Sequence, residues 1–231
     1  MIFLSRLFVL SVGFEEKFAV RTLTRHGLDI GDKLVLVTGP RVEKVDRTIS
    51  FIQDFIEKYY GRGIELKVFE LDFKEGFIYP VTRLVEFLMN CGSKYSSIIV
   101  NLSGGMRAVV LTLALTSMLV SCKIKGKLLV ELETEDSATL LKFEEGLLGL
   151  PVILSELEIR GTKALSEILN VLRSKALTVV ALAQLLEKDP STIRRHLLRL
   201  ERLGIVQATP LRPRSYTITP LGRLLLTLLE P

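Results

Sequence analysis

The 231-residue sequence contains only two histidines and two cysteines, and each scarcity excludes a class of protein. Cys91 and Cys122 stand alone, without CxxC spacing, so neither a disulfide framework nor a structural zinc site is indicated. Because His26 and His196 are the only histidines, a metal-centred active site is not predicted either. The function of this chain must depend on other residue types.

Long uninterrupted apolar runs are also absent. The opening MIFLSRLFVLSVGF looks like a short signal sequence, but Arg6 divides the run and no small-residue cleavage site follows it. The longest apolar stretch, residues 108–122, contains Thr112, Thr116 and Ser117 and is shorter than the ~20 residues that span a bilayer. We therefore expect no membrane partner and a cytoplasmic, reduced location.

Excess positive charge is confined to the last third of the chain. The whole sequence has 31 Lys and Arg against 26 Asp and Glu, a net charge of +5. Residues 161–231 hold 11 basic and 5 acidic side chains, a net +6, which leaves residues 1–160 at −1. A basic segment of this kind favours a polyanion such as nucleic acid as its partner.

Hydrophobic patterning predicts the architecture of the first part. Short β-branched runs, each followed by a helical pattern, occur at 6–12, 33–39, 64–72 and 96–102. This alternation predicts an α/β fold, a Rossmann-like and mostly parallel sheet with helices on both faces. Residues 126–136 and 138–146 are predicted to close the sheet as an antiparallel hairpin. The helix predicted at 108–122 is apolar nearly all round, so we expect it to be buried in the sheet layer or against a second copy.

The pattern changes after residue 160. Three short helical segments are followed by two strands around a Pro- and Arg-rich tip. We predict a first domain over residues 1–150 and a linker over 151–161, in which 152–159 has β-like character. A small winged helix-turn-helix domain is predicted over 162–231.

The stretch NLSGGMR, at 101–107, follows a predicted strand and opens a helix. It therefore lies at the carboxyl end of the sheet, where ligands of such folds bind. Gly104 and Gly105 allow close backbone approach, helix amides favour an anion, and Ser103 and Arg107 add a hydroxyl and a positive charge. The motif is neither a P-loop nor GxGxxG. Two interpretations stay open: a phosphate or ribose cradle, or a tight turn whose glycines serve packing alone.

Two other strand ends carry glycine. In SVGF, at 11–14, Ser11 and Gly13 end the first strand and Phe14 enters the helix. The first and fourth strands are neighbours across the switch point of the doubly wound order, so these two corners should lie together. TGPR, at 38–41 after the second strand, is a third candidate with lower weight because a Gly-Pro turn is ordinary loop chemistry.

The basic part contains a helix-turn-helix pattern. A turn at Asp189 and Pro190 precedes a helix in which Ile193, Leu197 and Leu200 should point inward. The residues predicted to contact DNA are Ser191, Thr192, Arg194, Arg195 and Arg199 on this helix and Arg212, Arg214 and Tyr216 at the hairpin tip. An apolar stripe with arginines on its outer side is typical of a recognition helix. Solvated surface arginines and a helical dimerisation module remain alternatives.

No nucleophile, base and acid are grouped in the sequence. Ser11, Ser103, Lys17 and His26 are candidates for slow chemistry, but each has a simpler structural explanation. The acidic run at 131–136 imitates a carboxylate cluster, and alternation on an exposed strand explains it better. We therefore assign no catalytic residue, no metal ligand and no cofactor.

The combination of SVGF, NLSGGMR and a carboxyl-terminal winged helix resembles the archaeal CRISPR-associated transcriptional regulators, whose sensor is the CARF domain, a CRISPR-associated Rossmann fold. The resemblance covers essentially the whole chain. NLSGGMR fits the family's loop of the type Asp/Asn-Leu-Thr/Ser-x-Gly-x-Arg/Lys. The ligand-side positions that the resemblance implies are Ser11, Gly13, Phe14, Asn101, Ser103, Gly104, Gly105, Met106 and Arg107.

The resemblance also implies partners and a role in antiviral defence. It implies a homodimer that binds cyclic oligoadenylate, here expected to be cyclic tetra-adenylate, across its two-fold axis. The winged helices would bind double-stranded DNA at promoters of CRISPR arrays or adaptation genes, with ligand binding altering the spacing of the recognition helices. A ring nuclease that slowly cleaves the cyclic ligand is the alternative. A third interpretation is a nucleotide-dependent α/β enzyme with a helical oligomerisation domain.

Overall fold

The computed structural model divides into two compact units, Met1–Leu148 and Gly149–Pro231. It describes residues 5–61, 63–92, 94–124, 126–136, 139–160, 163–210 and 212–229. Residues 161 and 162, where the predicted linker ends and the second domain begins, lie outside the described residues. Each unit has a hydrophobic core of its own.

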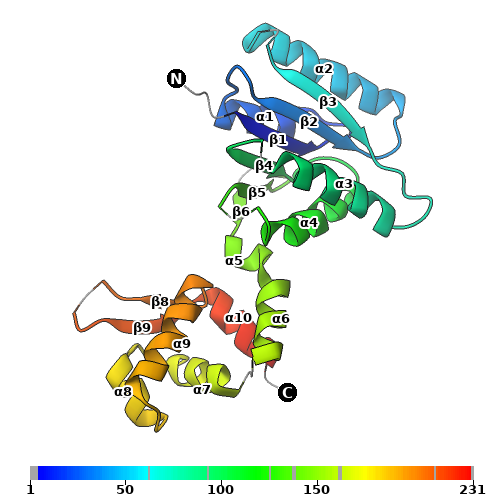
Figure 1. Ribbon diagram of the computed structural model, residues 1–231. Helices are drawn as coiled ribbons and strands as arrows, with labels where there is room; N and C mark the ends of the chain where they lie inside the picture. The colour runs from blue at the N-terminus through cyan, green and yellow to red at the C-terminus, as the bar shows by residue number, and fades with distance from the viewer. Residues whose placement is uncertain are drawn as a thin grey trace. The chain divides into compact units, whose positions relative to one another are not determined.

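The first unit is built on a six-stranded sheet in the order β3-β2-β1-β4-β5-β6 (Figure 1). Its strands are β1 (Arg6–Ser11), β2 (Lys33–Thr38), β3 (Glu65–Glu70), β4 (Ser97–Asn101), β5 (Leu128–Glu133) and β6 (Leu140–Phe143). β1 to β5 pair in parallel, and β6 runs antiparallel to β5. This is the order of a doubly wound Rossmann-like fold, so the predicted fold class is confirmed.

Helices cover both faces of this sheet. They are α1 (Lys17–His26), α2 (Glu43–Tyr59), α3 (Ile78–Cys91) and α4 (Arg107–Ser121), followed by the short α5 (Glu145–Leu148). α3 and α4 lie side by side on one face, where they pack against Leu7 and Val9 of β1 (Figure 1). α1 and α2 cover the other face, against Phe8 and Leu10. Because both faces are covered, β1 reads as a continuous apolar run rather than as an alternating strand.

The strand order brings two of the predicted corners together. β1 pairs directly with β4, and Leu10 lies opposite Asn101 at the carboxyl end of both strands. The sheet reverses its winding direction between these strands, because β2 and β3 extend to one side and β5 and β6 to the other. The predicted position of the switch point is therefore confirmed.

The sheet layer does not bury all of α4. Its inner side includes Val109 and Leu113, both 0% exposed. The outer side leaves Leu111, Leu115 and Leu119 exposed at 54%, 46% and 55%. These leucines are spaced four residues apart and follow one another along one side of the helix. They form the leucine stripe of α4.

The second unit combines helices with a three-stranded sheet in the order β7-β9-β8. Its elements are α6 (Leu150–Arg160), α7 (Lys163–Leu172), β7 (Leu177–Thr178), α8 (Val179–Leu185), α9 (Pro190–Arg202), β8 (Val206–Ala208), β9 (Ser215–Ile218) and α10 (Pro220–Leu229). β8 and β9 run side by side as a hairpin (Figure 1). Ile193, Leu197 and Leu200 of α9 are all 0% exposed, which confirms the predicted inner stripe.

The β-like character predicted for 152–159 is wrong, because these residues form most of α6. Pro151 is compatible with the first turn of a helix, and the Leu and Glu residues after it favour helix. Ile153 packs in the core of the second unit. Among the described helices, none combines the length and apolar character that crossing a bilayer requires.

Candidate functional site

The loops after β1 and β4 are in close backbone contact. A Cβ atom on Gly13 would lie 2.7 Å from the Cα of Gly105, and one on Gly104 would lie 2.7 Å from the carbonyl oxygen of Ser11. Gly105 also has a φ of +89°, a backbone conformation that residues with a side chain rarely adopt. The close approach of the two loops thus explains the glycines of NLSGGMR without a ligand.

The loop after β2 belongs to the same corner. A Cβ atom on Gly39 would lie 2.6 Å from the Sδ of Met106. The stretch TGPR, which sequence reasoning weighted lower, therefore lies against the β4–α4 loop. The sequence shows that a Gly-Pro turn follows β2, but it does not show what that turn packs against.

Three polar residues of the predicted site have side chains bound within the fold. Ser11, 3% exposed, donates its hydroxyl to the carbonyl oxygen of Asn101 at 3.1 Å. Asn101, 1% exposed, accepts from the amide of Ser103 at 2.9 Å and donates its Nδ2 to Glu131 at 3.3 Å. The hydroxyl of Ser103 accepts from the amide of Glu133 at 2.7 Å. These contacts fix the loop, and the place of the three residues on the ligand side stays a prediction.

The remaining side chains of the corner face outward. Phe14 is 62% and Met106 47% exposed, and Arg107 is exposed at the first position of α4. No side chain caps the start of α4, and its first turn contains no carboxylate. Arg107 also has no ion-pair partner among the described residues. The start of α4 therefore presents amide donors and an unpaired guanidinium, which together favour an anion.

The carboxylates of β5 are buried, so the prediction of an exposed acidic strand is wrong. Glu131 is 0% and Glu133 6% exposed, because α1 covers them. Arg25 reaches both, with its Nη1 at 2.8 Å from the Glu131 Oε1 and its Nη2 at 2.7 Å from the Glu133 Oε2. Arg21 pairs with Glu133, and His26 lies 3.1 Å from Glu131. The network ties α1 to β5 and, through the Glu131 contact described above, to the β4–α4 loop.

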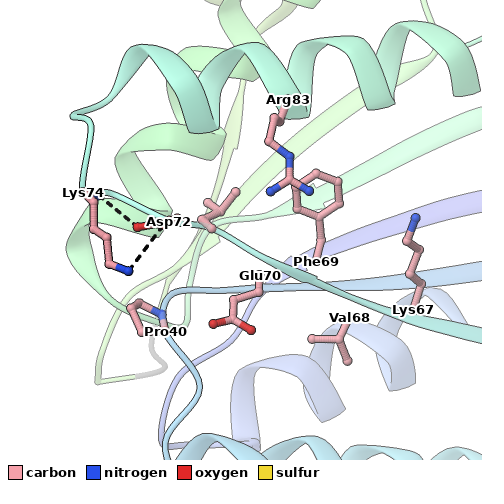
Figure 2. Close-up of a pocket in the computed structure, with 9 residues that line it drawn as sticks. Pro40, Lys67, Val68, Phe69, Glu70, Asp72, Lys74 and Arg83 are labelled. Carbon is pink, nitrogen blue, oxygen red and sulfur yellow. Dashed lines mark hydrogen bonds and ion pairs between the residues drawn. The ribbon is translucent and has the colours of Figure 1, made fainter.

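A hollow of about 470 Å³ lies at the outer strand of the sheet, β3 (Figure 2). Figure 2 shows Arg83 over the ring of Phe69, with its Cζ 4.9 Å from the ring centroid. Glu70 and the Asp72–Lys74 pair also line the hollow. Because cations and carboxylates surround the same space, it favours no single sign of ligand charge. Within the described residues, no group of three or more His, Cys, Asp or Glu is arranged to hold a metal ion.

α9 carries the predicted recognition surface. Its start is capped by Asp189, whose side chain accepts from the amide of Ser191 at 2.8 Å and from its hydroxyl. These hydrogen bonds lower the pKa of Asp189 below its ordinary value. Ser191, Arg194 and Arg195 are exposed, whereas Thr192 and Arg199 are half-buried.

A surface hollow of about 530 Å³ follows the outer side of α9. Besides the predicted residues, His196, Leu198 and Arg202 line it, and sequence reasoning did not select these. Burial, and then the charge of Arg195, lower the pKa of His196, so its imidazole is neutral at neutral pH. The outer side of α9 therefore joins arginine charges to a neutral ring and an apolar side chain.

The hairpin differs from its prediction at one residue. Arg212 and Arg214 are exposed, but Tyr216 lies in β9 and is 3% exposed, so its predicted place at the tip is wrong. Its ring is part of the core of the second unit, because alternation along β9 turns it inward. Arg214 lies over this ring, 5.6 Å from its centroid, and pairs with Glu201 of α9 at 2.7 Å. The hairpin is thereby attached to the recognition helix.

Comparison with known proteins gave two family matches and likenesses to solved structures. Residues 6–144 match the model of the Csa3 CRISPR-associated Rossmann-like domain, and residues 163–208 match that of the bacterial regulatory protein, arsR family. No curated protein matches the chain. Among solved structures, Enterococcus italicus Csm6 bound to cyclic hexa-2'-fluoro-hexa-dAMP is 13% identical with a TM-score of 0.46. The match covers 86% of this chain and 55% of that chain, so this chain spans about half the length of that protein.

Proposed function

The chain belongs to the family of the Csa3 CRISPR-associated Rossmann-like domain, which matches more than half of its length, and from this premise we propose that it is a ligand-gated transcriptional regulator of CRISPR-Cas genes or arrays. The first unit binds a cyclic oligoadenylate, for which we propose cyclic tetra-adenylate. The second unit binds double-stranded DNA, in agreement with its arsR-family match. The family match also confirms the resemblance drawn from the sequence motifs.

The start of α4 is the observation that carries the ligand proposal. The interlocked loops after β1 and β4 hold Arg107 outward, beside helix amides that no side chain caps. A phosphodiester offers the acceptor oxygens that such amides and a guanidinium bind. The glycines alone do not support a ligand, since packing explains them; the uncapped helix and the unpaired arginine do.

The leucine stripe supports a homodimer. It continues along α4 from Arg107, because Leu111, Leu115 and Leu119 follow at steps of four residues. A second copy packed on this stripe through a two-fold axis would cover it and bring two Arg107 residues to one site. A cyclic oligoadenylate of even size has a two-fold axis of its own, so each subunit would bind an equivalent half.

The DNA proposal is supported by the outer side of α9. Arg194 and Arg195 are exposed on a helix whose inner side is buried, and the hairpin adds Arg212 and Arg214. Arginines in this arrangement contact phosphates and base edges when the helix lies in the major groove. For the ligand to gate DNA binding, it must bind the two arrangements of the dimer with different affinity.

The geometry favours binding over cleavage of the ligand. Ring cleavage can use the ligand's own 2'-hydroxyl as nucleophile, and the hydroxyls of Ser11 and Ser103 are not placed to activate it, because each is engaged with a backbone group. Neither has a general base at hydrogen-bond distance within the described residues. We therefore propose a sensor rather than a ring nuclease.

Calorimetric titration with cyclic tetra-adenylate tests the ligand proposal. The wild-type protein should bind one ligand per dimer, and Arg107→Ala should lose at least tenfold in affinity, because a hydrogen bond to a charged group contributes about 1.5–3 kcal/mol. Arg47→Ala is the matched control, since Arg47 is exposed and pairs with Glu43 on α2. Absence of binding for this and other ring sizes would refute the proposed ligand.

A second titration tests the gating. DNA affinity is measured by fluorescence anisotropy with and without saturating cyclic tetra-adenylate. The proposal requires a change in affinity, and equal affinity under both conditions would remove the coupling while leaving the two binding functions intact.

A further inference from the structure

Around the corner formed by the loops after β1, β2 and β4, some charged side chains form ion pairs and others do not. Most cations have a carboxylate partner, in the pairs Lys17–Glu15, Arg41–Asp46 and Arg47–Glu43. Arg107 and Lys44 have none within ion-pair distance among the described residues. Lys44 is in the first turn of α2, just after the β2–α2 loop that contacts Met106. This loop thus brings a second unpaired cation to the corner.

Lys44 lies next to an exposed aromatic ring. Its Nζ is 5.6 Å from the centroid of Phe14, which follows β1 and is 62% exposed. The preceding residue, Gly13, is the one packed against Gly105. An exposed cation–π pair contributes little to stability, so the fold does not require this one. The pair leaves both the ring and the ammonium accessible beside the start of α4.

A ring and an ammonium at this spacing match the chemistry of a single-stranded nucleotide. Proteins that bind single strands stack bases on aromatic side chains and meet the backbone with cations. A hollow lined only by aliphatic side chains would offer neither an aromatic ring for the base nor a cation for the phosphate. Phe14 follows β1 and Lys44 lies in the first turn of α2, and the loops that precede α1 and α2 both pack against the β4–α4 loop, through Gly13 and Gly39.

We infer that Phe14 and Lys44 form one subsite for a nucleotide unit of the ligand, with an adenine base stacked on Phe14 and the adjoining phosphate at the Lys44 ammonium. This inference rests on the proposed function and deepens it, because it adds the β2–α2 corner to the ligand site. Arg107 and the α4 amides hold one phosphate of each half-ligand, and Lys44 holds the next. Phe14 makes recognition depend on a base as well as on charge.

The subsite is tested by titrating variants with cyclic tetra-adenylate at several salt concentrations. Lys44→Gln removes the ammonium, and Phe14→Leu removes the ring while retaining an apolar side chain. α2 provides a matched control at its other end, where the Lys58 Nζ lies 5.4 Å from the ring of the exposed Tyr59. Lys58→Gln and Tyr59→Leu alter the same kinds of group away from the corner.

The two subsite variants should fail in different ways. Lys44→Gln should reduce the slope of log affinity against log salt by ~0.7 for each phosphate that the protein no longer neutralises, twice per dimer. Phe14→Leu should weaken binding by about tenfold or more at an unchanged salt slope, since stacking is not a charge interaction. Phe14→Tyr should retain binding, and both control variants should match the wild-type protein.

Equal thermal unfolding midpoints for all variants establish that the fold is retained. If the wild-type protein binds and Lys44→Gln and Phe14→Leu behave as the controls do, this subsite is refuted while the proposed ligand stands. If the wild-type protein does not bind, the proposed ligand is refuted and the subsite with it. If Phe14→Leu and Phe14→Tyr weaken ligand binding equally, the stacking role is refuted.

Discussion

Helices α4 and α9 both follow a turn and begin a candidate binding surface, but their first turns are built differently. In α9, the Asp189 side chain accepts from the Ser191 amide, and this hydrogen bonding lowers the pKa of Asp189. In α4, the same position is held by Met106, whose side chain makes no such bond, and the first turn lacks a carboxylate. Since the first amides of a helix need partners, those of α4 are left for solvent or a ligand.

The outer sides of the two helices also differ, since one is apolar and the other is charged. α4 exposes Leu111, Leu115 and Leu119, whereas α9 exposes Arg194 and Arg195. Under the proposed function, α4 would bind an anion at its end and a second copy along its side. α9, whose end is capped by Asp189, would bind an anion along its side. Exchanging or removing these features one at a time should separate the two functions.

The largest effect is expected from placing a charge in the leucine stripe. Leu115→Glu should weaken dimerisation by about a hundredfold or more, because burial of a leucine contributes about 1.5–3 kcal/mol and the two-fold axis counts the loss twice. Sedimentation equilibrium over a range of concentrations measures it. Leu185→Glu on α8 is the control, since Leu185 is 57% exposed in the second unit. An unchanged dimer, or a monomeric wild-type protein, would contradict the stripe as an interface.

Removal of the arginines of α9 should affect DNA and not the ligand. Arg194→Ala and Arg195→Ala should each weaken binding to a short duplex by roughly tenfold and lower the salt slope by ~0.9 for each phosphate left without its arginine. Affinity for cyclic tetra-adenylate should stay the same. Arg223→Ala, an exposed arginine of α10, is the control. Loss of ligand binding in the α9 variants would mean that the two surfaces are not separate.

Giving α4 the kind of cap that α9 has should close its end to anions. Met106→Asp places a carboxylate at the N-cap, where it should stabilise the helix slightly and weaken cyclic tetra-adenylate binding about fivefold. Met106→Ala removes the side chain without adding charge and serves as the control. Calorimetric titration and thermal unfolding measure the two effects. Ligand affinity that is equal in the two variants would show that the end of α4 is not the anion site.

The smallest effect is expected from the cap of α9 and depends on pH. Because the pKa of Asp189 is lowered in the folded protein, its contribution to stability is present above the ordinary value of 3.8. It is lost as the pH falls through the lowered value. Asp189→Ala should lower the unfolding midpoint at neutral pH, and Asp189→Asn should keep the cap while removing this pH dependence. A wild-type midpoint that follows the Asn variant at every pH would argue against the contribution of the Asp189 charge, and one that equals the Ala variant at neutral pH would argue against the cap.

The fold of this chain could be predicted from the sequence because the patterns that indicate strands and helices involve neighbouring residues. Each β-branched run of the first unit is followed by a helical pattern, and that order restricts the sheet to a few topologies. The switch point followed from the same rule, and NLSGGMR marked one of its corners. The stretch 152–159 was misjudged, because short apolar runs do not distinguish a strand from a helix.

The errors within the site have a common origin. Glu131 and Glu133 alternate as an exposed strand does, but α1 lies over them and supplies Arg25 to both. Tyr216 follows two arginines and looks like part of their surface, yet it packs in the core. The helix that covers the two glutamates, α1, and the α7 residues in the core around Tyr216 are both far from these side chains in the sequence. Only a side chain's partner in space decides whether it is buried or presented.

The order of residues along the chain was enough to establish the doubly wound sheet, the helix-turn-helix pattern and the uneven charge, because periodicity, turn residues and composition act over neighbouring positions. Folding in three dimensions was needed to establish that Gly39 meets Met106, that Lys44 lies beside Phe14, and that Ser11 and Asn101 brace the corner instead of facing outward. These relations join residues that are 30 to 90 positions apart. They arise because β2, β1 and β4 are adjacent in the sheet and parallel, so their carboxyl ends lie side by side.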